Sequence, residues 1–241
     1  MADSLHSSGS YFRHFQVYQK MIDRGWRRSG TYCYKPDLRR SCCPAYTIKL
    51  FSPSKSQRKI ISRTAFLRQV TLEPSSFTEE KFVLYQKYQQ EIHHEKEKAP
   101  GGFKRFLVET PLHVSRLSMY RLDGELIAIG VIDILPNCVS SVYFMYDIKW
   151  EKFSLGKASL AKELHTAGVV DLKALYMGFY IHSCKKMRYK GDYYPSYLAD
   201  PEEYTWYPLE TCRPLLDKFH YVSFAHPEHN LEAPATEGCR I

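Results

Sequence analysis

The strongest apolar pattern of the chain lies in its middle. Two runs rich in β-branched and other apolar side chains, 117–122 and 125–135, flank the dipeptide Asp123-Gly124. An Asp-Gly pair tolerates the positive φ angles of a tight type I′ turn, so the two runs are predicted to form a β-hairpin. Residues 139–146 form an aromatic and β-branched run and are predicted to be the next strand.

Helical periodicity marks three segments. Apolar residues recur every three or four positions between residues 15 and 26, which predicts a short helix. Ser76 and Glu79 have the spacing of a capping box, which predicts a helix from there to about residue 96. A third helix is predicted over residues 155–167, where leucine and alanine fall at helical spacing.

Two further runs, 46–50 and 174–181, are predicted to be strands. From residue 117 onward the order is β-β-β-α-β, which means antiparallel strands followed by a helix and a returning strand. This order predicts an α+β fold with a mixed, mostly antiparallel sheet and flanking helices.

Changes in composition divide the chain into four parts. Residues 52–76 are rich in serine, lysine and arginine, and we interpret them as a basic linker with a solvated face. The linker separates a small N-terminal domain with a Cys-Cys pair, residues 1–51, from the main domain, residues 77–229. Residues 230–241 are expected to be a disordered tail.

Charge and cysteine content narrow the class of protein. The chain has 241 residues, 44% of them hydrophobic, and a net charge of +8, which favours a large core and a polyanionic partner such as nucleic acid over a neutral one. A basic protein without such a partner is the alternative. No apolar run reaches the roughly 18 residues of a membrane span. The first residues lack a signal-peptide pattern and the seven cysteines do not form a disulfide framework, so we expect an intracellular protein.

An aromatic strand leads directly into a cluster of cations. Residues 176–181 are apolar, and four basic residues follow within six positions, at Lys185, Lys186, Arg188 and Lys190. A buried strand that ends in concentrated positive charge is typical of an anion-binding site, and a solvated basic loop is the alternative.

Long motifs resemble those of one family. These are residues 130–143, 177–191 and 204–208, and upstream 23–30, 34–36 and 42–44. Together they resemble the arginyl-tRNA–protein transferases in order over nearly the whole chain. The resemblance implies a GNAT-like acyltransferase core preceded by the small cysteine-containing domain.

The resemblance also implies an activity. The family moves arginine from arginyl-tRNA to the α-amine of proteins with N-terminal Asp or Glu, and the product is marked for ubiquitin-dependent degradation. The reaction is the aminolysis of an ester and needs no cofactor. The implied protein is a monomer of the cytoplasm and also the nucleus. Two alternatives remain: an inactive tRNA- or degron-binding paralogue, and a CoA-dependent N-acetyltransferase, which the single glycine in residues 147–157 disfavours.

Three residues are candidates for the chemistry. Asp133, in an apolar strand, is a candidate base or ammonium anchor, and a structural carboxylate is the alternative. Tyr143 is a candidate for orienting the ester. His182 is a candidate for binding a phosphate or relaying a proton.

Substrate-binding candidates surround the cationic cluster. Arg188 and Lys190 are assigned to the acidic first residue of the acceptor, because arginine suits carboxylate recognition. Tyr146 and Tyr180 could orient the ester or stack on the terminal adenine, with core packing as the alternative. The remaining candidates are Lys186 and Tyr189 for substrate binding and Arg27, Arg28, Gly156, Lys157 and Lys185 for tRNA binding.

The resemblance further implies a zinc ion or an iron–sulfur cluster in the N-terminal domain, held by a Cys-x-x-Cys and a Cys-Cys pair. Only the pair, Cys42 and Cys43, is present, because residues 1–22 contain no cysteine. His6, His14 and Cys33 could contribute, although their spacing is not a known one. A tetrahedral site needs four ligands, so Cys42 and Cys43 form at most part of one.

Overall fold

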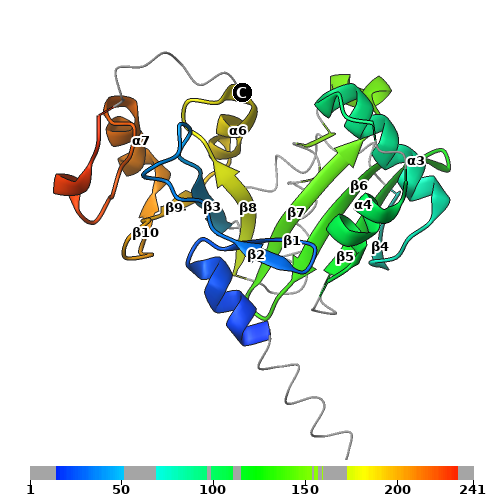
Figure 1. Ribbon diagram of the computed structural model, residues 1–241, viewed down its shortest axis with the longest axis horizontal. Coiled ribbons are helices and arrows are strands. Elements are labelled where there is room, and N and C mark those ends of the chain that lie inside the picture. The colour runs from blue at the N-terminus through cyan, green and yellow to red at the C-terminus, as the bar shows by residue number, and fades with distance from the viewer. Residues whose placement is uncertain are drawn as a thin grey trace, which may run out of the picture.

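The computed structural model describes residues 15–51, 69–96, 99–110, 115–153, 155–156, 159 and 173–232. Within these ranges one eight-stranded sheet organises the molecule, in the order β10-β9-β3-β8-β7-β6-β5-β4 (Figure 1). Its strands are β3 Tyr46–Phe51, β4 Gln69–Pro74, β5 Ser115–Leu122, β6 Glu125–Ile134, β7 Cys138–Tyr146, β8 Ala174–Tyr180, β9 Ser196–Ala199 and β10 Trp206–Pro208.

The central hairpin agrees with its prediction. Strands β5 and β6 pair antiparallel, with Leu122 opposite Glu125. Asp123 and Gly124 both have positive φ angles, 50° and 84°, as a type I′ turn requires. The next strand, β7, pairs antiparallel with β6. Eight of the ten residues of β6 are buried, because the sheet is covered on both faces.

The sheet divides between β7 and β8. These strands run parallel and pair only over Cys138–Ser140 and Ala174–Tyr176, although β7 continues to Tyr146 and β8 to Tyr180. Figure 1 shows the two strands diverging beyond this short pairing. The described residues 155, 156 and 159 are helical, and the rest of the predicted helix 155–167 lies outside the described residues. The prediction of an α+β fold with a mixed, mostly antiparallel sheet is confirmed.

Two segments outside the predicted main domain belong to this sheet. Strand β3 lies between β8 and β9 and pairs antiparallel with both. Residues 69–74, expected to be linker, form β4 and pair with β5. Residues 52–68 and 233–241 lie outside the described residues. Leu231, at the start of the expected tail, forms a bridge with Tyr221.

Each arm of the divided sheet has its own apolar core. One core joins β3, β8 and β9 to α7, Leu209–Lys218, and the other joins β5, β6 and β7 to α3, Glu79–Tyr88, and α4, Gly101–Phe103. Residues 15–23 are helical, and Tyr18 and Ile22 of this helix pack near the point where the two arms meet. None of the helices in the described ranges is long and apolar enough to cross a membrane.

The start of α3 differs from its prediction. The N-cap is Thr78, whose side chain accepts a hydrogen bond from the backbone N–H of Lys81 at 3.4 Å. Ser76 instead accepts from the Lys81 ammonium at 3.0 Å. Threonine caps a helix by the same mechanism as serine, so the capping-box spacing misplaced the cap by two residues. The helix continues as a π-helical segment, Gln89–His93.

Short helices complete the described chain. They are a π-helical turn Lys104–Val108, α6 Lys185–Arg188, and 3₁₀ turns Ile148–Phe153, Tyr189–Asp192 and Pro227–His229.

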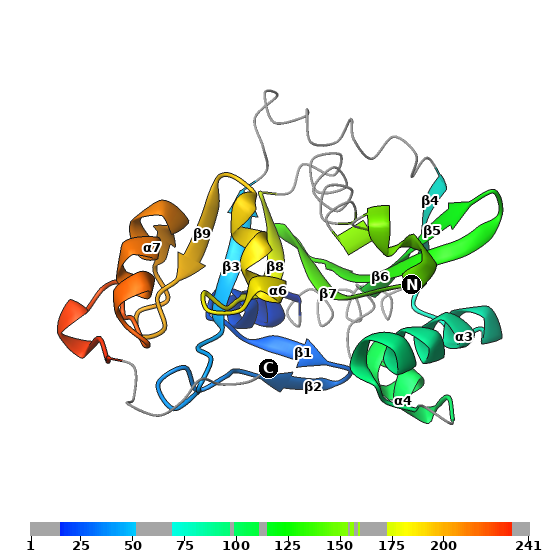
Figure 2. The same cartoon turned by 90° about the horizontal axis from the view of Figure 1, so that it is seen from above.

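A two-stranded hairpin, β1 Arg27–Ser29 and β2 Tyr32–Tyr34, connects the two arms. Figure 2 shows it running from the β3–β8 side of the sheet toward α4. Its turn contacts the segment after α4, where the Gly30 N–H donates to the Phe106 carbonyl at 3.1 Å. The hairpin therefore forms a wall between the arms where β7 and β8 diverge.

Candidate active site

A large cleft opens where β7 and β8 separate. It has a volume of about 790 Å³, and its walls come from β1, β7, β8, α6 and the end of α3. Eight of the predicted site residues line it: Arg27, Arg28, Tyr143, Tyr146, Gly156, Lys186, Tyr189 and Lys190. Diverging strands expose backbone and side chains that a continuous sheet would cover, so the cleft follows from the topology.

Arg28 forms a buried ion pair with Asp133 beside this cleft. Its Nε and Nη2 atoms each donate to one carboxylate oxygen at 2.7 Å, and Asp133 is 0% exposed. Tyr18 donates to Asp133 at 2.9 Å and Ser115 donates through its hydroxyl. A carboxylate has about four acceptor positions, and these four hydrogen bonds occupy them. Burial and the charge of Asp133 raise the pKa of Tyr18, which keeps its hydroxyl a donor.

This arrangement agrees with the structural role left open for Asp133. Its side chain accepts hydrogen bonds from three residues of the protein and is not among the residues that line the cleft. Arg28 is likewise held by a carboxylate of the protein. Arg28 and Asp133 together fasten β1 to β6.

Arg27 lies on the opposite side of β1 from Arg28, because successive side chains of a strand alternate. It is 6% exposed and contacts the rings of Tyr176 and Phe179, with its guanidinium carbon 5.4 and 5.7 Å from their centroids. Its Nη1 donates to the carbonyl of Trp26 at 2.8 Å and its Nη2 makes a longer contact, 3.5 Å, with the carbonyl of Gly178. Burial lowers the pKa of Arg27.

A bulge in β8 positions this arginine and a lysine. Gly178 has a φ of +77°, which favours glycine, and the pairing of β8 with β3 shifts register at this point. The carbonyls of Gly178 and Phe179 contact Arg27 and Lys190 respectively, the latter at 3.0 Å. The carbonyl groups of the bulge thus position Arg27 and Lys190 at the cleft without neutralising their charges.

Tyrosines form the opposite wall. Tyr88 makes edge contacts with Tyr143 and Tyr146. The Tyr143 hydroxyl donates to Gln89 Oε1 at 3.2 Å and lies 3.3 Å from His93 Nε2. Burial raises the pKa of Tyr143, and raises that of Tyr88 to about 12. These hydroxyls are therefore protonated at neutral pH. A bound substrate would accept the Tyr143 hydrogen bond in place of Gln89 Oε1.

Two family models match this chain. The model described as arginine-tRNA-protein transferase, C terminus, matches residues 80–200, which is half of the chain. The N-terminus model matches residues 2–59. The chain belongs to the arginine-tRNA-protein transferase family.

Individual proteins are similar over different shares of their length. The chain is 40% identical over 199 residues to arginyl-tRNA–protein transferase 1 of Arabidopsis thaliana, which covers 70% of this chain but only 31% of that protein. It is 38% identical over 186 residues to the aspartate/glutamate leucyltransferase of Pseudomonas savastanoi pv. phaseolicola, covering 75% and 78%. Among solved structures, L-PGS from Bacillus licheniformis aligns with a TM-score of 0.43 and 14% identity, covering 70% of this chain and 51% of that one.

Residues 185–190 of this transferase-family chain lie partly in the cleft and partly on the exposed surface outside it. Lys186, Tyr189 and Lys190 line the cleft, whereas Lys185 and Arg188 are exposed and are not among its lining residues. The basic side chains point in different directions because α6 is a short helix of four residues, Lys185–Arg188. The structure therefore supports a cleft position for Lys190 and not for Arg188.

Tyr180 and His182 also lie outside the lining of the cleft. The Tyr180 hydroxyl is 2.8 Å from His182 Nδ1, and His182 Nε2 is 2.7 Å from Asp217. The Tyr180 residue is fully buried, which agrees with the core-packing alternative. The His182 hydrogen bond lowers the pKa of Asp217.

Gly156 lies close to Tyr189, since a Cβ atom at Gly156 would be 3.7 Å from the Tyr189 hydroxyl. Its predicted neighbour in tRNA binding, Lys157, lies outside the described residues. The start of the predicted helix therefore lies at the edge of the cleft. The binding of a tRNA phosphate by Gly156 stays a prediction.

The described residues do not fit a complete metal centre. The sulfur atoms of Cys42 and Cys43 are 3.7 Å apart, and no group of three or more His, Cys, Asp and Glu residues suited to a metal occurs in the described ranges. Cys42 is disulfide-bonded, so Cys43 alone of this pair has a free thiol. One free sulfur falls short of the four ligands of a structural zinc site. His6 and His14 lie outside the described residues, so a zinc ion or iron–sulfur cluster stays a prediction.

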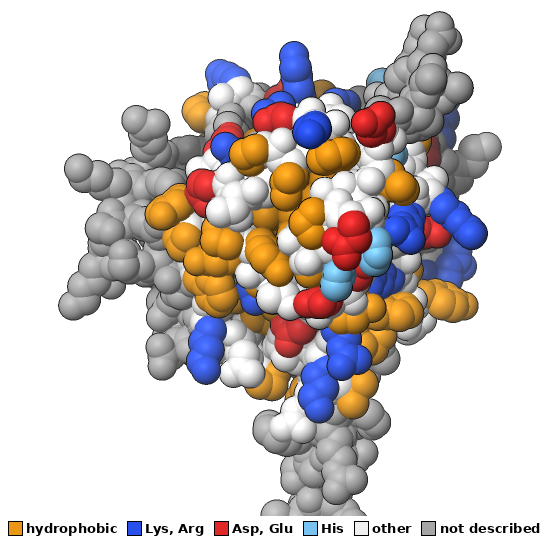
Figure 3. Space-filling view, turned by 90° about the vertical axis from the view of Figure 1, so that its left-hand side faces the viewer, with side chains coloured by type: hydrophobic (Ala, Val, Ile, Leu, Met, Phe, Trp, Pro, Cys, Tyr) orange, Lys and Arg blue, Asp and Glu red, His pale blue; other side chains and the backbone are white. Residues whose placement is uncertain are grey.

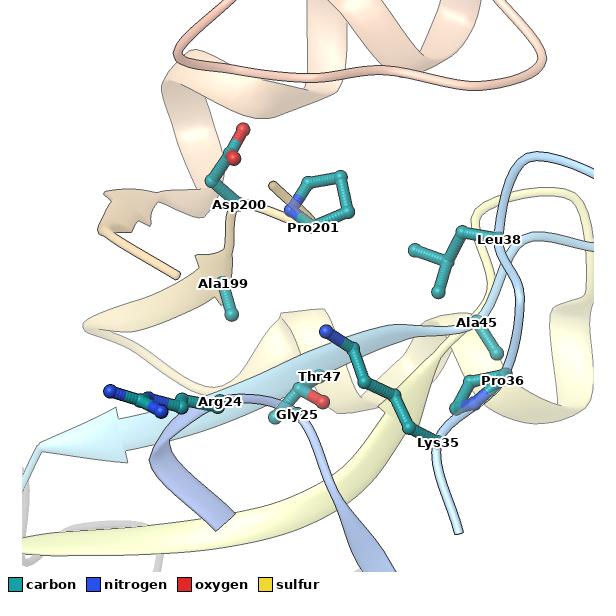
Figure 4. Close-up of a pocket in the computed structure, with 10 residues that line it drawn as sticks. All are labelled: Arg24, Gly25, Lys35, Pro36, Leu38, Ala45, Thr47, Ala199, Asp200 and Pro201. Atoms are coloured by element: carbon teal, nitrogen blue, oxygen red, sulfur yellow. The ribbon is translucent and has the colours of Figure 1, made fainter. Parts of the chain in front are cut away.

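A second cavity, shown in Figure 4, is far smaller than the cleft. Its volume of about 20 Å³ is enough for about one water molecule. Asp200, at its edge, accepts hydrogen bonds from Ser223 and from the backbone N–H groups of Glu202, Glu203, Phe224 and Ala225. These bonds fasten the C-terminal loops, and the cavity has no room for a substrate.

Contacts between histidine and carboxylate side chains lie on the α7 side of the molecule. Figure 3 shows histidines beside acidic side chains on this face. His226 pairs with Glu203 at 2.8 Å and His229 with Glu202 at 2.7 Å. These contacts tie the last described loop to the turn after β9 and lie apart from the cleft.

Several residues of the cleft were not among the predicted site residues. Tyr88 appeared only at the edge of a helical stripe, and Glu91 and Glu151 had no pattern that distinguished them from solvated acids. Gly178 did carry a signal, because an isolated glycine inside a strand pattern predicts a bulge.

Proposed function

We propose that this protein transfers arginine from arginyl-tRNA to the α-amine of proteins whose first residue is Asp or Glu. The observation that carries the proposal is a cleft lined by cations and tyrosines, between the diverging strands of a chain that belongs to the transferase family. The words aspartate/glutamate in the name of the Pseudomonas relative support an acidic acceptor. The resulting degradation of the acceptor and a cytoplasmic and nuclear location are part of the same proposal.

The proposed reaction is the aminolysis of an ester. The neutral α-amine attacks the carbonyl carbon of the aminoacyl ester, and negative charge develops on the carbonyl oxygen. Collapse of this intermediate breaks the bond to the ribose oxygen, which leaves as a hydroxyl with a proton, while the amine nitrogen loses one. Holding both reactants in the cleft supplies much of the acceleration.

Tyr143 is suited to stabilise the developing negative charge. Tyr143 lines the cleft, and its raised pKa keeps the hydroxyl protonated at neutral pH. Its proton, donated to Gln89 Oε1 in the structure, would be donated to the oxyanion instead. A donor placed before the reaction toward a developing oxyanion stabilises the transition state more than the ground state.

Replacing Tyr143 by phenylalanine is expected to lower kcat about 10- to 100-fold, because the ring remains and only the donor is lost. Single-turnover transfer from labelled arginyl-tRNA measures this effect. Tyr197→Phe, on β9 and outside the cleft lining, is the control and should retain the wild-type rate. A Tyr143→Phe rate equal to that of the control would rule out this role.

Leucine is a second candidate for the transferred residue, because the relative covered over 78% of its length is named a leucyltransferase. Two carboxylates in the cleft favour arginine. Glu91 and Glu151 both line it on the side of α3 and the turn after β7, and either can attract a guanidinium. A leucine side chain would gain nothing from them.

The double variant Glu91→Gln/Glu151→Gln is expected to lower kcat/KM for arginyl-tRNA about 10-fold relative to leucyl-tRNA, since charge-assisted hydrogen bonds of this size would be lost. The measurement is competitive transfer from the two labelled tRNAs. Glu125→Gln, in an exposed ion pair with Lys149, is the control. An unchanged ratio in the double variant would remove both glutamates from donor selection.

The proposed function itself is tested with peptides that begin with Asp, Glu or Ala. Label from arginyl-tRNA is expected on the Asp and Glu peptides only. Transfer from leucyl-tRNA alone would establish the second candidate, and transfer from acetyl-CoA would indicate an N-acetyltransferase. Binding of arginyl-tRNA without any transfer would indicate a binding protein and overturn the proposal.

A further inference from the structure

The guanidinium edge formed by Nε and Nη2 is used differently in two adjacent arginines. In Arg28 this edge holds both oxygens of Asp133 at 2.7 Å. In Arg27 the same edge has no carboxylate: Nε has no hydrogen-bond partner in the described structure, and Nη2 makes only the 3.5 Å contact with the Gly178 carbonyl. The described structure therefore shows one arginine with this edge paired to a carboxylate and one with a buried edge that has no such partner.

The charge of Arg27 has no acidic partner among the described residues. Its hydrogen bonds go to the carbonyls of Trp26 and Gly178, and it also contacts the rings of Tyr176 and Phe179. Carbonyl dipoles and aromatic faces stabilise a cation without neutralising it. A buried charge is costly unless it is paired. An anion that entered the cleft would therefore provide the counter-charge that Arg27 lacks.

The geometry points to Arg27 as the residue that binds the side-chain carboxylate of the acceptor's first residue. This inference rests on the proposed function and assigns its acceptor specificity. Arg27 lines the cleft together with Tyr143 and contacts the carbonyl of Gly178 in the bulge. An acceptor with its carboxylate on Arg27 would direct its amine toward the space between the two walls.

A carboxylate fits this position better than a phosphate of the tRNA backbone. Arg27 is 6% exposed and lies against two rings, so it is reached by a short side chain and not by a bulky polyanion. The planar edge of a guanidinium matches two carboxylate oxygens. Arg28, which follows Arg27 in β1, binds Asp133 of β6 in this way. Lys190, bonded to the next carbonyl of the bulge, adds positive potential beside it.

The inference changes two predicted assignments. Arg27 moves from tRNA binding to acceptor recognition, and Arg188 leaves acceptor recognition because it is exposed and outside the cleft lining. Lys190 keeps its predicted place near the acidic residue.

The test compares peptides that begin with Asp and with its uncharged isostere Asn. In Arg27→Lys the charge is kept and the two-donor edge is lost, so the ratio of kcat/KM for the Asp peptide over the Asn peptide is expected to fall about 10- to 100-fold. The affinity for arginyl-tRNA should stay within about two-fold of wild type, because the ester partner is not bound by this residue. Arg121→Lys, at the exposed edge beside Glu80, is the matched control and should keep the wild-type ratio.

Arg27→Met gives a second measurement, in which the preference for Asp over Asn should be lost. If either variant transfers too slowly to measure, the same ratio is read from the affinities of the two peptides, and thermal unfolding shows whether the variant is folded. A wild-type ratio in folded Arg27→Lys overturns the inference, as does weaker arginyl-tRNA binding with an unchanged ratio, which would indicate a phosphate. A wild-type protein that transfers nothing to Asp peptides would instead overturn the proposed function.

Discussion

Replacing Asp133 by asparagine is expected to destabilise the protein by about 3–5 kcal/mol, because it leaves Arg28 buried without its counter-charge. Asp133 is 0% exposed and the Arg28 side chain 2% exposed. An asparagine can offer only one oxygen, so its NH₂ group would face a donor of Arg28 or the Ser115 hydroxyl. The free energy of unfolding in urea measures the effect.

Asp37→Asn is the matched control. Asp37 pairs with Arg40 at 3.8 Å, and both side chains are more than half exposed, so its loss is expected to change the free energy of unfolding by less than about 1 kcal/mol. The pair of variants also separates the two roles predicted for Asp133. If Asp133→Asn unfolds like wild type but has lost arginine transfer, Asp133 acts in the chemistry and not in fastening β1 to β6.

The main strands could be predicted from the sequence because their signals are local. Runs of β-branched residues and the Asp123-Gly124 turn specify β5, β6 and β7 within 32 residues of chain, Ser115 to Tyr146. The place of β3 could not be predicted in the same way. Its partner β8 begins at Ala174, and a pairing over that separation leaves no periodic trace in either strand.

The types of residue that line the cleft could be predicted from the sequence, but the partners of each side chain could not. Two successive arginines look equivalent in the sequence. Only the fold shows that Arg28 meets a carboxylate 105 positions away while Arg27 turns toward the bulge at Gly178. Similarly, the four clustered cations predicted an anion site. The fold of α6 and the following 3₁₀ turn places Lys186 and Lys190 in the lining of the cleft and leaves Arg188 outside it.

Replacing Gly30 by alanine is expected to destabilise the protein by about 2–4 kcal/mol. Gly30 has a φ of +59°, and a Cβ atom there would lie 1.9 Å from the Arg105 carbonyl oxygen. The left-handed conformation costs about 1–2 kcal/mol for alanine, and the backbone must also move apart. That movement breaks the hydrogen bond from Gly30 to Phe106, which is worth about 1 kcal/mol.

Gly124→Ala isolates the cost of the contact. Gly124 has a comparable φ of +84° but no atom within 4 Å of a Cβ position, so only the conformational cost of about 1–2 kcal/mol applies. Urea unfolding should therefore separate the two variants by at least about 1 kcal/mol. Equal losses would mean that the hairpin is not docked on the segment after α4. A larger loss at Gly30, accompanied by weaker discrimination between Asp and Asn peptides, would show that this docking also holds Arg27 in the wall of the cleft.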